Sequence, residues 1–146
     1  METNEFNVQQ AVPFFWVADM AVSLAFYIKG LGFELKSKWE PRGRIEWCWL
    51  QLGKASIMLQ EHAKEGKQAT VFAENKKGTG VSINFTCKDS IALYHEFKGK
   101  GIDVSEPMVG NGLWEILVTD PDGFRLFFES ETDAPEETKY SDWVNK

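Results

Sequence analysis

The chain has 146 residues, of which 43% are hydrophobic and 26% charged, and its 16 Lys and Arg against 22 Asp and Glu give a net charge of −6. This length supports one good core, or two small modules that share one, and excludes a large multidomain enzyme. The acidic balance, without any Lys/Arg-rich run, argues against nucleic acid or an anionic membrane as the main partner.

Cysteine usage and the N-terminal sequence predict a cytoplasmic protein. Cys48 and Cys87 lie in β-rich runs without CxxC spacing, which favours a reduced protein over a secreted disulfide scaffold. Residues 1–5 are polar and acidic, and no apolar run of 18 residues occurs. We therefore expect neither a signal peptide nor a membrane span.

The first half of the chain predicts the element order β-α-β-β-β. A strand at 12–17 precedes Asp19, which is a suitable N-cap for a helix over 20–28, and Gly30 and Gly32 end that helix. Three further strands are predicted at residues 33–39, 44–52 and 55–60.

The same order returns in the second half. A strand at 81–87, a cap at Asp89 and a helix over 91–98 are followed by a strand at 102–104 and a hairpin over 114–129. The two caps, Asp19 and Asp89, are 70 residues apart in the sequence, which indicates a duplicated module. We therefore predict an α+β fold of two tandem βαβββ modules whose curled mixed sheets enclose a cleft.

One domain is predicted to span 1–146. Module one covers 12–61 and module two 80–130. Residues 62–79 have no sustained apolar period and are read as a linker or partly ordered loop. The tail, 131–146, is polar except for Tyr140, Trp143 and Val144, and is expected to be either flexible or a lid-like segment that docks its Trp.

The hairpin turn has a clear physical basis. In Asp120-Pro121-Asp122-Gly123, proline fixes φ at one corner, the aspartates can cap their own backbone, and glycine accepts a positive φ. The strand that follows alternates, with Phe124, Leu126 and Phe128 on one face and Arg125, Phe127 and Glu129 on the other.

The repeat and four short motifs together resemble the vicinal oxygen chelate superfamily, which includes glyoxalase I, extradiol dioxygenases and the bleomycin-resistance binding proteins. The motifs are Val17-Ala18-Asp19, Leu24-Ala25-Phe26-Tyr27, Leu31-Gly32-Phe33-Glu34 and Asp120-Pro121-Asp122-Gly123. The resemblance covers roughly residues 12–129. It implies two modules around a cleft, in a homodimer.

Metal-using members of that superfamily take His and Glu ligands from the first and last strands of each module. The resemblance places these positions at Val12, Met58, Ser82 and Phe127, which supply neither imidazole nor carboxylate. We therefore expect no metal, no other cofactor and no catalytic residue, as in the bleomycin-resistance branch.

The strand faces opposite the apolar sets should line the cleft with aromatic rings and a few polar groups, which suits a small organic ligand. Phe14, Trp47 and Trp49 are expected to serve more as core or dimer interface than as ligand contacts, although Phe14 stays in the candidate set. The predicted ligand-binding residues are Phe14, Trp16, Met58, Gln60, Asn84, Trp114, Arg125, Phe127 and Glu129.

The leading hypothesis is a non-catalytic protein that binds a small molecule, such as an antibiotic, in its cleft. Its ligand would be cationic or aromatic, and neither nucleic acid nor membrane would be a partner. One alternative is a glyoxalase-like lyase or a dioxygenase with displaced metal ligands. Another is a scaffold that uses the fold as a dimeric interaction module.

Overall fold

The protein is described from a computed structural model, which places residues 6–145. Met1–Glu5, on which the expectation of no signal peptide rests, and Lys146 lie outside the described residues. The described chain forms two four-stranded mixed sheets, one per module, and the sheets do not close into a barrel. The predicted α+β fold of two tandem βαβββ modules is confirmed.

Module one forms the sheet β1-β4-β3-β2. Strands β1 and β4 are parallel, whereas β4, β3 and β2 are antiparallel neighbours. Its elements are β1 (Phe14–Val17), α1 (Met20–Leu24), the π-helical turn η1 (Ala25–Gly30), β2 (Glu34–Trp39), the 3-10 turn η2 (Pro41–Gly43), β3 (Trp47–Leu52) and β4 (Ala55–Glu61).

Module two repeats this arrangement as the sheet β5-β8-β7-β6, with β5 and β8 parallel. Its elements are β5 (Ser82–Thr86), α3 (Ser90–Gly99), β6 (Met108–Gly110), β7 (Leu113–Thr119) and β8 (Arg125–Glu131). The strand predicted at 102–104 was wrong. That segment contributes a single bridge, Val104 to Val118, and the edge strand forms four residues later, at Met108.

The helices begin where their caps predict. The Asp19 carboxylate accepts a hydrogen bond from the Val22 amide at 3.3 Å, and the Asp89 carboxylate accepts one from Ala92 at 2.9 Å. The first helix then runs through η1 to Gly30. A Cβ at Gly30 would lie 2.8 Å from Ile102 of module two, so this position lets the two modules approach closely.

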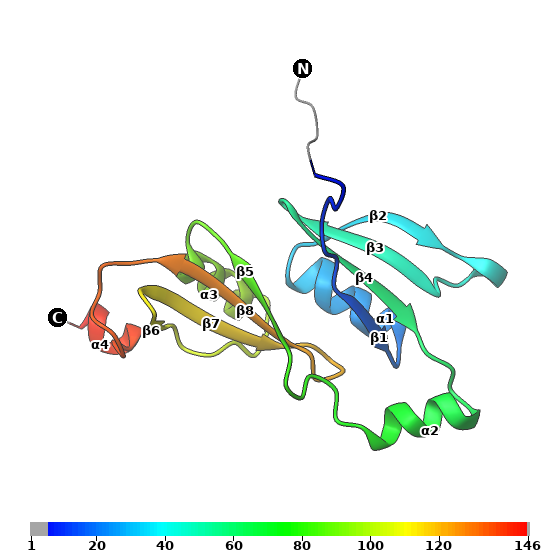
Figure 1. Ribbon diagram of the computed structural model, residues 1–146. Helices are drawn as coiled ribbons and strands as arrows, with labels where there is room; N and C mark the ends of the chain where they lie inside the picture. The colour runs from blue at the N-terminus through cyan, green and yellow to red at the C-terminus, as the bar shows by residue number, and fades with distance from the viewer. Residues whose placement is uncertain (1–5, 146) are drawn as a thin grey trace.

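The helix-covered sides of the two sheets share one hydrophobic core. Phe15 of β1 stacks on Phe124 of the hairpin at 4.2 Å, and Phe33 meets Phe85 edge-on at 6.1 Å. Figure 1 shows the two modules side by side, with the β7–β8 turn reaching the end of β1. The modules are therefore joined by buried apolar contacts as well as by the chain.

Two segments outside the sheets are more ordered than the sequence suggests. The expected loop at 62–79 contains α2 (Gly66–Glu74), none of whose side chains is buried. The tail forms α4 (Tyr140–Val144), and Trp143 lies 6.1 Å from Trp114, so the docked alternative holds. No described helix is both long and apolar enough to span a bilayer.

Candidate functional site

Four predicted ligand residues share the face of the first sheet that points away from α1. Phe14 pairs with Met58, and Trp16 pairs with Gln60, so the two pairs form adjacent rows across β1 and β4. Phe14 is 43% exposed and Trp16 36%. The row of Phe14 and Met58 continues through Trp49 of β3 and Ser37 of β2. The row of Trp16 and Gln60 continues through Trp47 and Trp39.

This surface, which we call the aromatic face, is defined by Phe14, Trp16, Trp39, Trp47, Trp49 and Met58. Trp47 and Trp49 are only partly buried, and Trp39 is 54% exposed. Phe14 and Trp16 stack nearly parallel, with ring centroids 5.7 Å apart. A continuous exposed surface of this kind is typical of a binding site rather than of ordinary protein surface.

The corresponding face of the second sheet carries the polar members of the predicted set. Asn84 pairs with Phe127, and Arg125 lies with its guanidinium 5.5 Å from the Phe127 ring centroid. The Asn84 amide donates a short hydrogen bond to the buried Glu129 carboxylate. We call this surface, together with Glu115 and Leu117 of β7, the polar face.

Two carboxylates lie opposite each other on the polar face. Glu115 pairs across the strands with Glu129. Partial burial raises the pKa of Glu115, and the nearby charges of Glu129 and Glu136 raise it further. Among residues 6–145, no ion pair includes Glu115 or Glu129. This pair would favour a positively charged group on a ligand.

Trp114 does not join either surface. It shares a face of β7 with the buried Ile116 and Val118, is itself 6% exposed, and packs with Val109 and Tyr140. The Ser90 hydroxyl, at the start of α3, donates to the Trp114 carbonyl at 2.8 Å. Trp114 is therefore a packing residue under α3 and the tail.

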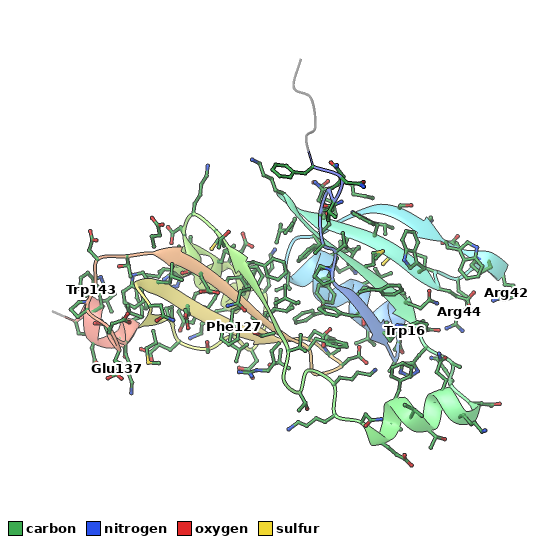
Figure 2. All side chains as sticks on the ribbon, in the orientation of Figure 1. Trp16, Arg42, Arg44, Phe127, Glu137 and Trp143 are labelled. Carbon is green, nitrogen blue, oxygen red and sulfur yellow. The ribbon has the colours of Figure 1, made fainter. Side chains whose placement is uncertain are left out.

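The structure divides the remaining predicted residues among separate hollows. Arg125 and Phe127 line a cavity of about 260 Å³ beside Glu115 and Leu117. Asn84 lines another, of about 500 Å³, between β5 and the β3–β4 turn. Figure 2 shows Trp16 and Phe127 on different modules. Within one chain, the aromatic and polar faces thus lie on two sheets and do not meet in these hollows.

The chain's histidines are not grouped for metal binding. His62 stacks on Phe72 at 4.6 Å, and His95 Nε2 lies 3.2 Å from the Tyr140 hydroxyl. Among residues 6–145, no cluster of three or more His, Cys, Asp or Glu side chains could hold a metal ion. Met58 and Phe127, two of the inherited ligand positions, lie on the aromatic and polar faces.

The β7–β8 turn connects the modules through its two aspartates. The Asp120 carboxylate accepts a 2.7 Å hydrogen bond from the Tyr27 hydroxyl, and it caps its own turn by accepting from the amides of Asp122 and Phe124. Burial raises the pKa of Asp120, although these hydrogen bonds oppose the shift, and burial also raises that of Tyr27.

Asp122 connects the same turn to two further segments. Its Oδ1 accepts from the Ala18 amide at 2.9 Å and from Lys77 Nζ at 3.1 Å. Both members of the Lys77–Asp122 pair are largely buried, at 12% and 7% side-chain exposure. The turn therefore joins module one, the connecting segment and module two.

Sequence reasoning missed the contribution of the connecting segment. Phe72, from α2, stacks on Trp16 at 5.8 Å and on His62 at 4.6 Å, so α2 covers one end of the aromatic face. Figure 2 shows Trp16 at the end of β1 next to α2. The only apolar signal in this segment is Val71-Phe72 in an otherwise polar stretch, which is too little to predict a packed helix.

Comparison with known proteins identifies a family and several solved structures that resemble this chain. Residues 9–128 match the model of the Glyoxalase/Bleomycin resistance protein/Dioxygenase superfamily. No curated protein sequence matches significantly. Among solved structures, TnmS3, an antibiotic binding protein from Streptomyces sp. CB03234, shares 17% identity over 88% of this chain and 100% of its own, with a TM-score of 0.65.

Two further structures have the same fold. A bleomycin-binding protein solved in complex with bleomycin is 21% identical over 86% of this chain and 100% of its own, with a TM-score of 0.65. TioX from Micromonospora sp. ML1 is 18% identical over 87% and 99%, with a TM-score of 0.63. At these identities the similarity is one of fold.

Proposed function

The chain belongs to the Glyoxalase/Bleomycin resistance protein/Dioxygenase superfamily, and on that basis we propose that it is a non-catalytic binding protein for small organic molecules. The observation that carries this proposal is the aromatic face, where Phe14, Trp16 and Trp39 remain 36–54% exposed on one sheet. Rings held on a rigid strand lose little entropy when a planar ligand stacks on them.

The polar face supports a positively charged ligand. Glu115 and Glu129 face each other, and neither has a cationic partner among the described ion pairs. A cation between them would relieve the repulsion that helps to raise the pKa of Glu115. The similarity in fold to a bleomycin-binding protein and to an antibiotic binding protein is consistent with a ligand of this class.

A two-fold homodimer would bring the two faces together. Residues 12–79 carry ten Lys and Arg against seven Asp and Glu, whereas residues 80–146 carry six against thirteen. Two antiparallel copies related by a two-fold axis would therefore place the basic half of each chain against the acidic half of the other. The aromatic face of one copy would then complete a site with the polar face of its partner.

The residues at the inherited metal positions give no support to a lyase or a dioxygenase. Val12 and Phe127 have no donor atom in their side chains, and Ser82 and Met58 are weak ligands for the hard divalent ions used by such enzymes. The proposed activity is accordingly binding alone.

Titration with two cationic aromatic probes tests the proposal. Metal-free bleomycin and proflavine should each bind saturably, one per polar face, and quench Trp fluorescence. Glu115→Gln should weaken both, by about two- to tenfold for the loss of one partly buried charge contact. Glu96→Gln, which removes an exposed carboxylate on α3, is the matched control. Absence of saturable binding of either probe, or equal affinity in the two variants, would contradict the proposal.

A further inference from the structure

A cavity of about 1120 Å³ lies beneath α2, next to the ends of the aromatic and polar faces, and its lining includes neither Trp16 nor the Glu115–Glu129 pair. In Figure 1, α2 stands away from both sheets, beyond the end of β1. One wall is the inner side of α2, with Ala69, Phe72 and Ala73. The other walls are residues 75–80 and the β7–β8 turn. Its size is that of a site for a small organic molecule.

The cavity is cationic in a protein that is acidic overall. Lys64, Lys76, Lys77 and Arg125 line it. Lys77 is paired with Asp122, but the ion pairs among residues 6–145 include none of the other three cations. The local charge is thus opposite to the net charge of −6.

The two carboxylates in the cavity wall, Asp120 and Asp122, are fewer than its four cations, so they offset this charge only in part. Asp122 already accepts from Ala18 and Lys77. Asp120 is 4% exposed and is engaged by Tyr27 and by its own turn. The positive groups near the opening therefore remain available to an anion.

A stacked aromatic pair forms part of the lining. The rings of His62 and Phe72 are 4.6 Å apart and only 12° from parallel. Lys77 Nζ lies 5.2 Å from the Phe72 ring centroid. A planar ligand can therefore meet a ring and a positive charge in one place.

The walls are held together without a ligand. A Cβ at Gly78 would lie 2.2 Å from the Gly123 carbonyl oxygen, so the connecting segment packs directly against the turn. Gly78 has a φ of +79°, a second reason for glycine here. With the largely buried Lys77–Asp122 pair, this contact fixes residues 77–78 on module two. The cavity is preformed on the side away from α2.

From this combination we propose that the cavity beneath α2 is a second binding site, specific for planar aromatic anions such as carboxylates. The ring would pack edge to face against the stacked His62 and Phe72 rings, and the carboxylate would face Lys64 and Lys76. This site differs in charge preference from the one formed by the aromatic and polar faces. It neither depends on that site nor shares its acidic pair.

Naphthalene-2-carboxylate tests the proposal, with naphthalen-2-ylmethylammonium as a probe of the same size and opposite charge. Calorimetric titration should show saturable binding of the carboxylate, tighter than the ammonium by about tenfold or more. The difference should shrink between about 0.05 and 0.5 M salt, because the lysines are solvent-accessible. Equal affinities for the two probes, or no saturation by the carboxylate, would overturn the proposal.

Variants of the lining residues test whether the carboxylate binds in this cavity. The double variant Lys64→Gln/Lys76→Gln should bind the carboxylate probe about tenfold more weakly, since each exposed charge contributes about two- to fivefold to the affinity. Phe72→Leu, which keeps apolar volume and removes the ring, should weaken it by about two- to tenfold. Lys88→Gln, an exposed lysine before α3, should change nothing.

Amide shifts in nuclear magnetic resonance spectra locate the bound probe. The carboxylate should shift Gly78 and Gly80, which line the cavity, and should leave bound proflavine in place. Shifts confined to β7 and β8, displacement of proflavine, or unchanged affinity in the double lysine variant would each refute this site. The first proposal could still hold in every one of those cases.

Discussion

The Tyr27 hydroxyl of module one donates a 2.7 Å hydrogen bond to the Asp120 carboxylate of module two, and both side chains are buried. The two residues are 93 positions apart in the sequence. This bond is polar and lies at the edge of the shared core, where an unpaired carboxylate oxygen would be costly.

Replacing Tyr27 with Phe should therefore destabilise the fold. Loss of the hydroxyl leaves Asp120 Oδ2 buried without this donor, which costs about 1–3 kcal/mol. The urea midpoint measures the effect. Tyr94→Phe is the matched control, because the Tyr94 hydroxyl only accepts from the exposed Lys98, and its cost should stay below about 0.5 kcal/mol. Equal midpoints for the two variants would show that the buried bond contributes nothing.

The pH dependence of stability should carry the signature of Asp120. Its pKa in the folded state lies above the unfolded value, mainly because of burial. The folded state therefore holds this proton more tightly, and stability falls as pH rises from the unfolded pKa through the folded one. Asp120→Asn removes this dependence.

The free energy of unfolding of wild type minus that of Asp120→Asn should decrease as pH rises from about 4, where the unfolded carboxyl titrates. Urea titrations at a series of pH values measure this difference, in which the other carboxyl groups cancel. A difference that grows with pH would mean that the pKa of Asp120 is depressed in the folded state.

Trp16→Ala should affect ligand affinity more than stability. Stacking contributes roughly 1 kcal/mol per aromatic partner beyond area burial, so proflavine and bleomycin should bind about fivefold more weakly or worse. Phe15→Ala is the comparison. The Phe15 ring lies on the opposite face of β1 and is 5% exposed, so its loss should cost about 3–5 kcal/mol of stability. A large midpoint loss for Trp16→Ala with unchanged affinity would make Trp16 a core residue.

We expect the purified protein to bind no stoichiometric divalent metal. The side chains of Val12 and Phe127 cannot coordinate, and those of Met58 and Ser82 offer poor ligands at the inherited positions. Dialysis against Zn²⁺ or Ni²⁺ followed by elemental analysis measures the content. One tightly held ion per chain would contradict this expectation and revive the lyase and dioxygenase alternatives.

The proposed dimer should depend on the aromatic face. Sedimentation at tens of micromolar, an order-of-magnitude range for stable association, should give the mass of two chains. Trp39→Glu, which places a charge on this face at a 54% exposed position, should shift the protein toward monomer. Val22→Glu, at a 50% exposed position on α1, should not. A wild-type protein that is monomeric at this concentration would rule the dimer out.

Local rules were sufficient for the repeat, the helix caps and the hairpin. Asp19 and Asp89 cap their helices as their positions predict, because capping depends on residues only three positions away. The alternation in β8 places Leu126 and Phe128 in the core, at 0% and 1% exposure. Period-two patterning is decisive where one face of a strand is buried.

Long-range contacts account for the rest. Helix α2 buries no side chain, and its main contacts are Phe72 on Trp16 and, just after it, Lys77 on Asp122, so no local period could predict it. The prediction of Trp114 as a ligand residue is wrong, because Trp114 alternates in phase with the buried Ile116 and Val118. That phase places it under α3, as the structure shows.

The stacked rings of Phe15 and Phe124 make the stability of each half of the chain depend on the other half. Each half exposes apolar surface that only the other covers, so the pair should melt in a single cooperative transition. A chain cut once by a protease between Lys64 and Gly66 would run as two fragments in denaturing gels. In native buffer the fragments should remain one particle, which makes this peptide segment a natural place to split the protein into a two-part reporter.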